Sequence, residues 1–378
     1  MSISSQINDK IGAFKDTLES HPECRADFRD KAALTGKTSH YAAFRVGRLP
    51  DIAHGEGKHA PPPPPMTPEE RLLKQLEGAS APVEMLNPIA PFRGIGKGPG
   101  TLAASFGIFL NPELSFTPDG SRPIEDILAE GLPSPETSGI MPEMKEDIEA
   151  VKAYTPDWFK IPLPDMQGPF NIAHMVLGDG AFMAPLLEPD KWHPFMEIVT
   201  EFMIQAHRIL SQWIGPERLY THPKDYKRIA ECSVNMVDTQ FYLDYILPYD
   251  RKLVEYYGGE VAIHPCSGPH VFTETLENLD GIVYTEAGLM INKMSAGSIS
   301  VEEALEKIGD RPIMLSVGEE LAENAEEETV KRLFKLTANN PRVMFSGFTG
   351  LGWKKGDEPK MLDFHKKMND IYAETRNV

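Results

Sequence analysis

Residues 261–286, VAIHPCSGPHVFTETLENLDGIVYTE, contain two short apolar runs, and each run ends in side chains that can carry chemistry. His264 directly follows Val261–Ile263, and Glu286 follows Gly281–Tyr284 with one residue, Thr285, between them. Short apolar runs bounded by Pro and Gly are typical of buried strands. We therefore predict two neighbouring strands in this segment.

The same pattern continues along the chain, where further apolar runs are separated by longer amphipathic stretches. The other predicted strands are Val83–Leu86, Phe159–Leu163, Ser233–Val237, Ile313–Val317 and Val343–Phe345. The predicted helices are Pro189–Ile214, Thr239–Tyr257, Val301–Ile308, Ala325–Leu336 and Lys360–Tyr372. Repeated strand-then-helix units predict a parallel sheet. This number of units favours an α/β fold of the closed (β/α)8 TIM-barrel type over an open sheet.

A run of five prolines at 61–65 divides the chain, because consecutive prolines favour an extended polyproline segment. We expect residues 1–65 to be an N-terminal extension with a proline-rich linker, in which Ile11–Leu18 and Asp27–Leu34 form short helices. Residues 66–378 are the predicted barrel. Its opening helix begins with Thr67 as the capping residue and ends at Gly78.

The composition excludes several classes of protein. A formal net charge of −18 over 378 residues argues against a nucleic-acid or anionic-membrane surface, since phosphate binding needs clustered cations. Three cysteines, Cys24, Cys232 and Cys266, do not make a disulfide framework and favour a reducing compartment. We see no secretory signal and no apolar run long enough to span a membrane, so we expect a cytoplasmic protein.

His264, Cys266 and Glu286 form the strongest chemical pattern. Residues i and i+2 of a strand point to the same side, so His264 and Cys266 share a face if the strand continues through Pro265. Imidazole, thiolate and carboxylate are all zinc ligands, and neighbouring parallel strands lie about 4.8 Å apart. The alternative is a small buried cysteine and a hydrogen-bonded carboxylate at the end of a strand.

A second group of polar residues follows two other predicted strands. Asp165 and Gln167 come after Phe159–Leu163, and Asn235 and Asp238 end the run around Val234. Held at strand ends, such side chains are suited to orienting a small-molecule substrate, although Asp at a turn also bonds its own backbone. His174 and His270 are weaker candidates, and each also fits a surface or interface histidine.

Several segments resemble the uroporphyrinogen decarboxylase superfamily, in particular its cobalamin-dependent methyltransferase branch. They are MTPEERLL (66–73), TLAASFG (101–107), FTPDG (116–120), DMQGPF (165–170), ILPY (246–249) and HPC (264–266). The resemblance covers about residues 66–375 in serial order. It implies a (β/α)8 barrel and a homodimer, with a zinc ion on His264 and Cys266 and a corrinoid as the methyl carrier. The sequence has no recognisable D-x-H-x-x-G segment of the kind that binds cobalamin, so we expect the corrinoid to arrive free or on a separate corrinoid protein.

Two positions depart from the family pattern. The methyltransferases carry a further cysteine ligand where this chain has Thr349, and the decarboxylase has histidine there. The arginine-rich segment of the decarboxylase is echoed only by RVGRLP at 45–50, before the proline run. We therefore favour a methyltransferase that moves a methyl group between a corrinoid and a small substrate. A decarboxylase or other lyase for a carboxylated substrate and a non-catalytic ligand-binding homologue are the alternatives.

Overall fold

A computed structural model describes most of the N-terminal two-thirds of the chain and the strands of the C-terminal third. The described residues are 2–20, 41–45, 65–79, 94–111, 117–221, 227–259, 261–264, 275, 277–280, 282–289, 306, 309, 313–317, 331–332, 334–335, 343–348, 370–371 and 374–375.

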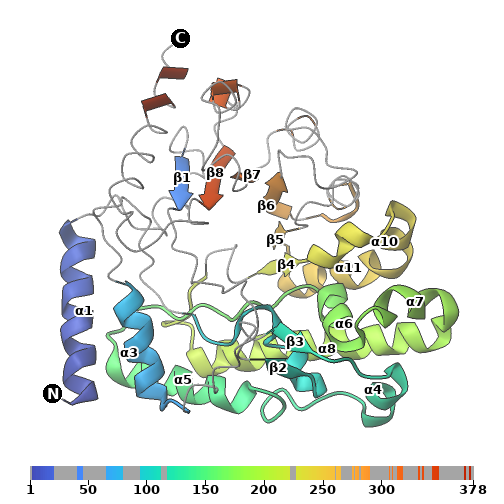
Figure 1. Ribbon diagram of the computed structural model, residues 1–378, viewed down its shortest axis with the longest axis horizontal. Helices are drawn as coiled ribbons and strands as arrows, with labels where there is room; N and C mark the ends of the chain where they lie inside the picture. The colour runs from blue at the N-terminus through green and yellow to red at the C-terminus, as the bar shows by residue number, and fades with distance from the viewer. Residues whose placement is uncertain are drawn as a thin grey trace, which may run out of the picture.

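Six parallel strands form the main sheet, in the order β1-β8-β7-β6-β5-β4. They follow one another across the molecule in that order (Figure 1). The strands are β1 (Tyr41–Arg45), β4 (Arg228–Ala230), β5 (Val261–His264), β6 (Ile282–Leu289), β7 (Ile313–Val317) and β8 (Val343–Phe348). A separate antiparallel pair consists of β2 (Phe109–Asn111) and β3 (Thr117–Asp119). A parallel bridge joins Ile161 to Leu219 outside these strands.

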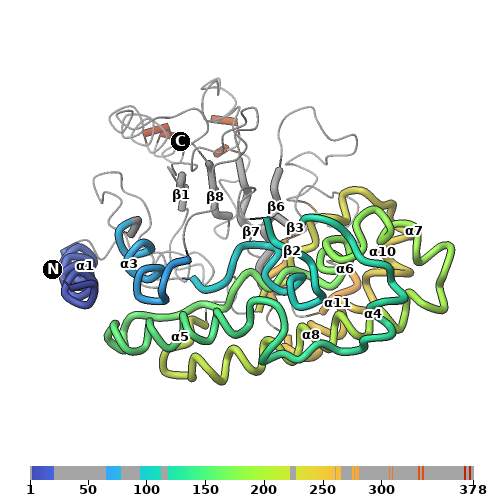
Figure 2. Tube along the Cα trace, turned by 60° about the horizontal axis from the view of Figure 1, so that its bottom comes forward, coloured from blue at the N-terminus to red at the C-terminus, as the bar shows by residue number. Residues whose placement is uncertain are grey.

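The α-helices that the structure describes in full come from residues 3–257 of the chain, and the long helix α8 contacts more of them than any other helix does. The α-helices are α1 (Ile3–Ser20), α3 (Pro68–Ala79), α4 (Ile124–Glu130), α5 (Met141–Tyr154), α6 (Pro169–Leu177), α7 (Gly180–Leu187), α8 (Pro189–Ile214), α10 (Thr239–Tyr245) and α11 (Leu247–Tyr257). The 3-10 helices are η3 (Gly98–Gly100), η4 (Ala103–Phe106) and η6 (Cys232–Met236). Figure 2 shows α6, α7, α10 and α11 gathered at the end of the molecule opposite α1.

α8 is predicted from the sequence with the bounds that the structure gives it, because its apolar side chains recur at helical spacing. Its buried face contacts α4, α5, α6, α7 and α11. The members of that face include Trp192, Phe195, Val199, Phe202 and Leu210, each fully buried. This burial makes α8 the main packing element of the helical layer.

Residues 1–65, predicted to be an N-terminal extension, contribute a strand and a helix to the main fold. β1 lies inside that range and pairs in parallel with β8. α1 is longer than the predicted Ile11–Leu18 and packs on α3 and α5. Phe14 of α1 stacks on Trp158 with ring centroids 6.4 Å apart, so the helix is anchored in the main core. The predicted helix Asp27–Leu34 lies outside the described residues.

The start of α3 confirms the predicted opening helix. The backbone N–H of Glu70 donates to Thr67 Oγ1, and the backbone N–H of Thr67 donates to a Glu70 carboxylate oxygen. This reciprocal pair is a capping box, which satisfies two amide donors that the first helical turn leaves without partners.

β5, β6, β7 and β8 confirm four of the predicted strands, with β7 matching at both ends. The prediction at Ser233–Val237 is wrong, because Cys232–Met236 is a 3-10 helix and the strand lies earlier, at β4. Thr239–Tyr257 is two helices, which break at Ile246 just before Pro248. Phe159–Leu163 is no strand and contributes bridge residues at Lys160 and Ile161, and Val83–Leu86 lies outside the described residues.

The parallel order of six strands suits the predicted barrel, and closure into (β/α)8 stays a prediction. No single helix of the described residues is long and apolar enough to cross a membrane. The consecutive helices α6 and α7 reach that length and apolar composition when taken together, but their axes are bent by 102°.

Candidate functional site

Polar residues follow or end β4 and β5 at the carboxyl edge of the sheet, whereas Glu286 lies inside β6, which continues to Leu289 and does not end at Glu286 as predicted. Glu231 directly follows β4, and its backbone N–H donates to the carbonyl of His264, the last residue of β5, at 2.9 Å. Ile263 pairs with Thr285, so His264 and Glu286 occupy the same level on neighbouring strands. The carboxyl ends of parallel strands are where barrel and open-sheet enzymes place their active sites.

The turn at 165–168 approaches this edge from the segment that precedes α6. Asp165 is half-buried, and its Oδ1 lies 3.6 Å from the guanidinium of Arg228 on β4. Gln167 is buried and has φ of +59°, the single positive φ among the described residues other than glycine. A left-handed backbone at a non-glycine residue is strained by about 1 kcal/mol or more and is found mainly where surrounding contacts enforce it.

Glu231 supplies those contacts at the first turn of α6. Its Oε1 accepts the backbone N–H of Phe170 and its Oε2 accepts that of Asn171, both at 2.9 Å. These amides are helix donors that lack intrahelical partners, and the helix N-terminus favours a negative charge. The carboxyl fits only because Gly168 has no side chain, since a Cβ there would lie 2.2 Å from Glu231 Oε1. Glu231 therefore fastens α6 and its turn to β4.

A chain of side-chain amides continues from the same region of η6. The backbone N–H of Ser233 donates to Asn171 Oδ1 at 2.7 Å, and Asn171 Nδ2 donates to Gln167 Oε1 at 2.6 Å. The Ser233 hydroxyl also bonds Nδ1 of His174 at 2.8 Å. Burial lowers the pKa of His174, so its imidazole is neutral at physiological pH. The turn is thus tied to η6 through α6.

A second carboxyl group, Asp250 of α11, meets Glu231 in the interior. Both are fully buried, and a hydrogen bond joins their side chains. The Tyr242 hydroxyl donates to Asp250 Oδ2 at 3.2 Å and also bonds Thr275. Burial raises the pKa of Glu231 well above its usual range and raises that of Asp250 to about 7. Two carboxyl groups joined in this way must share a proton, as two adjacent buried charges cannot both persist.

The other predicted site residues are found in different settings. Asn235 is exposed on η6, and Asp238 is exposed and caps α10 by accepting the backbone N–H of Phe241 at 2.8 Å. Neither residue ends a strand as predicted, and their substrate roles stay predictions. Cys266, His270 and Thr349, together with the side chain of Glu286, lie outside the described residues. Among the side chains that are described, no three His, Cys, Asp or Glu residues group as metal ligands.

The fold is similar to that of a solved methyltransferase from Methanosarcina mazei. The two structures superpose with a TM-score of 0.60 at 14% sequence identity, over 90% of this chain and 97% of that chain. No protein-family model and no curated protein matches the sequence. At this identity the likeness establishes a shared fold over nearly the whole length of both chains.

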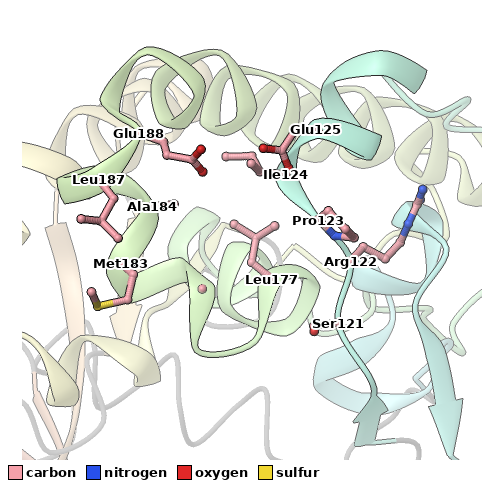
Figure 3. A pocket seen from close by; sticks show the side chains of 11 residues that line it. Ser121, Arg122, Pro123, Ile124, Glu125, Leu177, Met183, Ala184, Leu187 and Glu188 are labelled. Atoms are coloured by element: carbon pink, nitrogen blue, oxygen red, sulfur yellow. The ribbon is translucent and has the colours of Figure 1, made fainter.

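A separate cavity of about 470 Å³ lies between α4, α6 and α7, away from the turn at 165–168. Leu177 points into it from α6, and the carboxylates of Glu125 and Glu188 face each other across it (Figure 3). Lys191 forms ion pairs with both carboxylates. Met183 and Leu187 of α7 complete an apolar wall that is partly exposed to solvent.

The sequence interpretation missed Glu231, Asp250, Asn171 and Ser233. One pattern in the sequence marks Asp250, because it lies on the apolar face of α11 among side chains at helical spacing. The buried residues around it on α11 include Leu247, Tyr249, Leu253, Val254 and Tyr257. A carboxylate on such a face needs a buried partner. For Glu231 the signal is weaker: a single acidic residue after a three-residue strand.

Proposed function

We propose that this chain is a methyltransferase-like enzyme on a (β/α)8 barrel, with its active site at the carboxyl edge of the parallel sheet. The observation that carries the proposal is the fold shared with the Methanosarcina mazei methyltransferase over nearly the whole chain. It is supported by the strained Gln167 turn and by the position of His264 at that edge, level with Glu286 of the neighbouring strand. Strain of this kind gathers at functional sites.

The metal in this proposal is zinc, held by His264, Cys266 and Glu286. The strand register supports the fit, because His264 and Glu286 occupy the same level on strands that lie about 4.8 Å apart. Cys266 follows two residues after His264. Nitrogen, sulfur and oxygen donors are the ligands that zinc accepts, and three protein ligands leave a fourth position open. When bound, zinc lowers the pKa of a substrate thiol, so that the thiolate is available at neutral pH.

The protein groups around that position bind and orient the substrate. Asp165 and Gln167 lie in the turn that Glu231 fixes, and Arg228 offsets the charge of Asp165. The methyl carrier is a corrinoid, which arrives free or on a separate corrinoid protein. A corrinoid would supply the methyl group and keep the electron pair of the bond to it, while Asp165 and Gln167 would hold the substrate thiolate in position to accept that group.

The function is tested by incubating the purified protein with methylcobalamin and 3-mercaptopropionate. We expect S-methylated product, with a His264→Ala variant at least about 100-fold slower, as expected for losing one ligand of a catalytic metal. His193→Ala is the matched control, because His193 lies on α8 and bonds Tyr249. Carbon dioxide release from a carboxylated substrate without methyl transfer would instead support the lyase alternative.

The metal is tested separately by elemental analysis. We expect about one zinc per chain, lost in Cys266→Ala. Thr349→Cys should raise zinc affinity because thiolate is a stronger zinc donor than a hydroxyl, and Thr349→Ala should leave it unchanged. No change in zinc affinity on Thr349→Cys would place residue 349 away from the metal and remove that detail of the proposal.

A further inference from the structure

The hydrogen bonds around Gln167 fix which end of its amide group is available to a ligand. The Ser233 backbone N–H can only donate, so the Asn171 atom that it bonds is the oxygen. The other end of the Asn171 amide is then the donating Nδ2, and the Gln167 atom that it bonds must be Oε1. The Nε2 group of Gln167, with its two N–H donors, therefore points away from Asn171.

Within the described residues, this contact with Asn171 is the one hydrogen bond of the Gln167 side chain. The surrounding contacts leave the side chain little freedom. Gln167 is 5% exposed, its backbone is held at positive φ, and the next residue, Gly168, is closed in by Glu231. A donor that is oriented before the ligand arrives binds with a smaller loss of conformational entropy.

Resting on the function proposed above, we propose that Gln167 determines specificity by donating from Nε2 to a carboxylate oxygen of the substrate. Asn171 and Ser233 are positioning residues that set the direction of this donor, and Glu231 holds the turn that carries it. Arg228 lies 3.6 Å from Asp165 and offsets its negative charge, which lowers the repulsion between this turn and an anionic group. The ligand class is a small thiol acid, in which the thiol follows from the proposed function and the acid group is the partner of Gln167.

Binding of two matched thiols tests the donor directly. The probes are 3-mercaptopropionate, which ends in a carboxylate, and 3-mercapto-1-propanol, which ends in a hydroxyl, each titrated into the zinc-loaded protein in a calorimeter. We expect the wild-type protein to bind the carboxylate roughly 10-fold or more tightly than the alcohol, as expected for a hydrogen bond to a charged group. Gln167→Met keeps the length and neutrality of the side chain but removes the donor, and it should abolish this preference.

A second variant reverses the donor without changing Gln167. In Asn171→Asp both side-chain oxygens accept, so Gln167 must turn its Nε2 toward the new carboxylate and present Oε1 to the ligand. The preference for the carboxylate thiol should again be lost. Gln205→Met on α8, where Gln205 bonds Glu201, is the matched control and should retain the wild-type preference. Thermal midpoints of all variants identify any that fail to fold.

The outcomes separate this inference from the proposed function. Equal binding of the two thiols by the wild-type protein, or a preference that survives in Gln167→Met, would overturn the role of Gln167, and binding of neither thiol would overturn that role and the proposed function together. If the binding pattern is as expected but methylcobalamin is not consumed, the donor assignment stands and the methyltransferase proposal fails. Methyl transfer with equal kcat/KM for the two thiols would sink the donor assignment alone.

Discussion

The side chain of Glu231 occupies the space beside Gly168, and it can do so because glycine has no side chain. A Cβ at residue 168 would lie 2.2 Å from Glu231 Oε1, a carboxyl held by two backbone amides and unable to withdraw. We therefore expect Gly168→Ala to lower the free energy of unfolding by about 2 kcal/mol, within the range for overpacked sites. Chemical denaturation measures it.

The control for this substitution is Gly180→Ala in the first turn of α7. A Cβ at residue 180 would meet Leu177 at 3.7 Å, an ordinary contact distance. Alanine is also the better helix former, so stability should stay equal or rise by up to about 1 kcal/mol. Equal effects of the two substitutions would show that Glu231 does not occupy the space beside Gly168.

The carboxyl pair predicts how stability depends on pH. The pKa of Asp250 is raised to about 7 in the folded protein and is about 3.9 in an unfolded chain, so between these values the folded state binds more protons. The free energy of unfolding should therefore fall as pH rises from about 4 to about 7, by up to about 1.4 kcal/mol per pH unit for one proton.

Asp250→Asn should remove that dependence while preserving the hydrogen bonds. The asparagine oxygen can accept from Tyr242, and its Nδ2 can donate to Glu231 in place of the shared proton. The variant should gain stability over wild type as pH rises through this window, measured by urea denaturation at pH 5 and pH 7.5. Asp244→Asn, at an exposed position of α10, is the control. A parallel pH profile in Asp250→Asn and wild type would contradict the shared proton.

At the scale of elements, helix α1 belongs to the folded core. Phe14 is 3% exposed, and its ring contacts Trp158 and Phe159 with centroids 6.4 and 5.9 Å away. Phe14→Ala should lower the free energy of unfolding by about 3 kcal/mol or more, as for other buried phenylalanines. Lys15→Ala, on the exposed side, should change it by less than about 0.5 kcal/mol. A cost below about 1 kcal/mol for Phe14→Ala would mean that α1 is a detachable extension.

The elements that the sequence predicts well are those with enough residues to show a period or an unbroken apolar run. α8 has 26 residues with one apolar face, and β7 is a five-residue strand, IMLSV, in which Ser316 is the one polar residue. β4 has three residues, too few for any period, and the neighbouring Ser233-Val-Asn-Met-Val237 alternates like a strand although its first four residues belong to the 3-10 helix Cys232–Met236. Register and turn conformation, including the positive φ of Gln167, depend on contacts with other elements and leave no local pattern.

In the candidate site, too, the residues that a local sequence pattern marks are predicted, and those that depend on distant contacts are missed. Asp165, Gln167 and His264 are predicted from the sequence because they follow apolar runs; the structure places His264 at the carboxyl end of β5 and the turn at 165–168 against Glu231, which follows β4. Glu231 and Asp250 are missed because a buried carboxyl is stable only beside a partner from a distant element. That partnership is a property of the packed molecule, set by β4, α6 and α11 together.

At the scale of the whole molecule, the account depends on zinc at the carboxyl edge of the sheet. The protein, stripped of metal with a chelator and dialysed, is mixed with methylcobalamin and 3-mercaptopropionate, and the loss of methylcobalamin absorbance is followed. We expect no transfer above the uncatalysed rate, and full transfer after one equivalent of zinc is restored, because the thiol is then bound as thiolate. A rate that is the same before and after zinc removal, or no transfer by the zinc-loaded protein, would contradict the account.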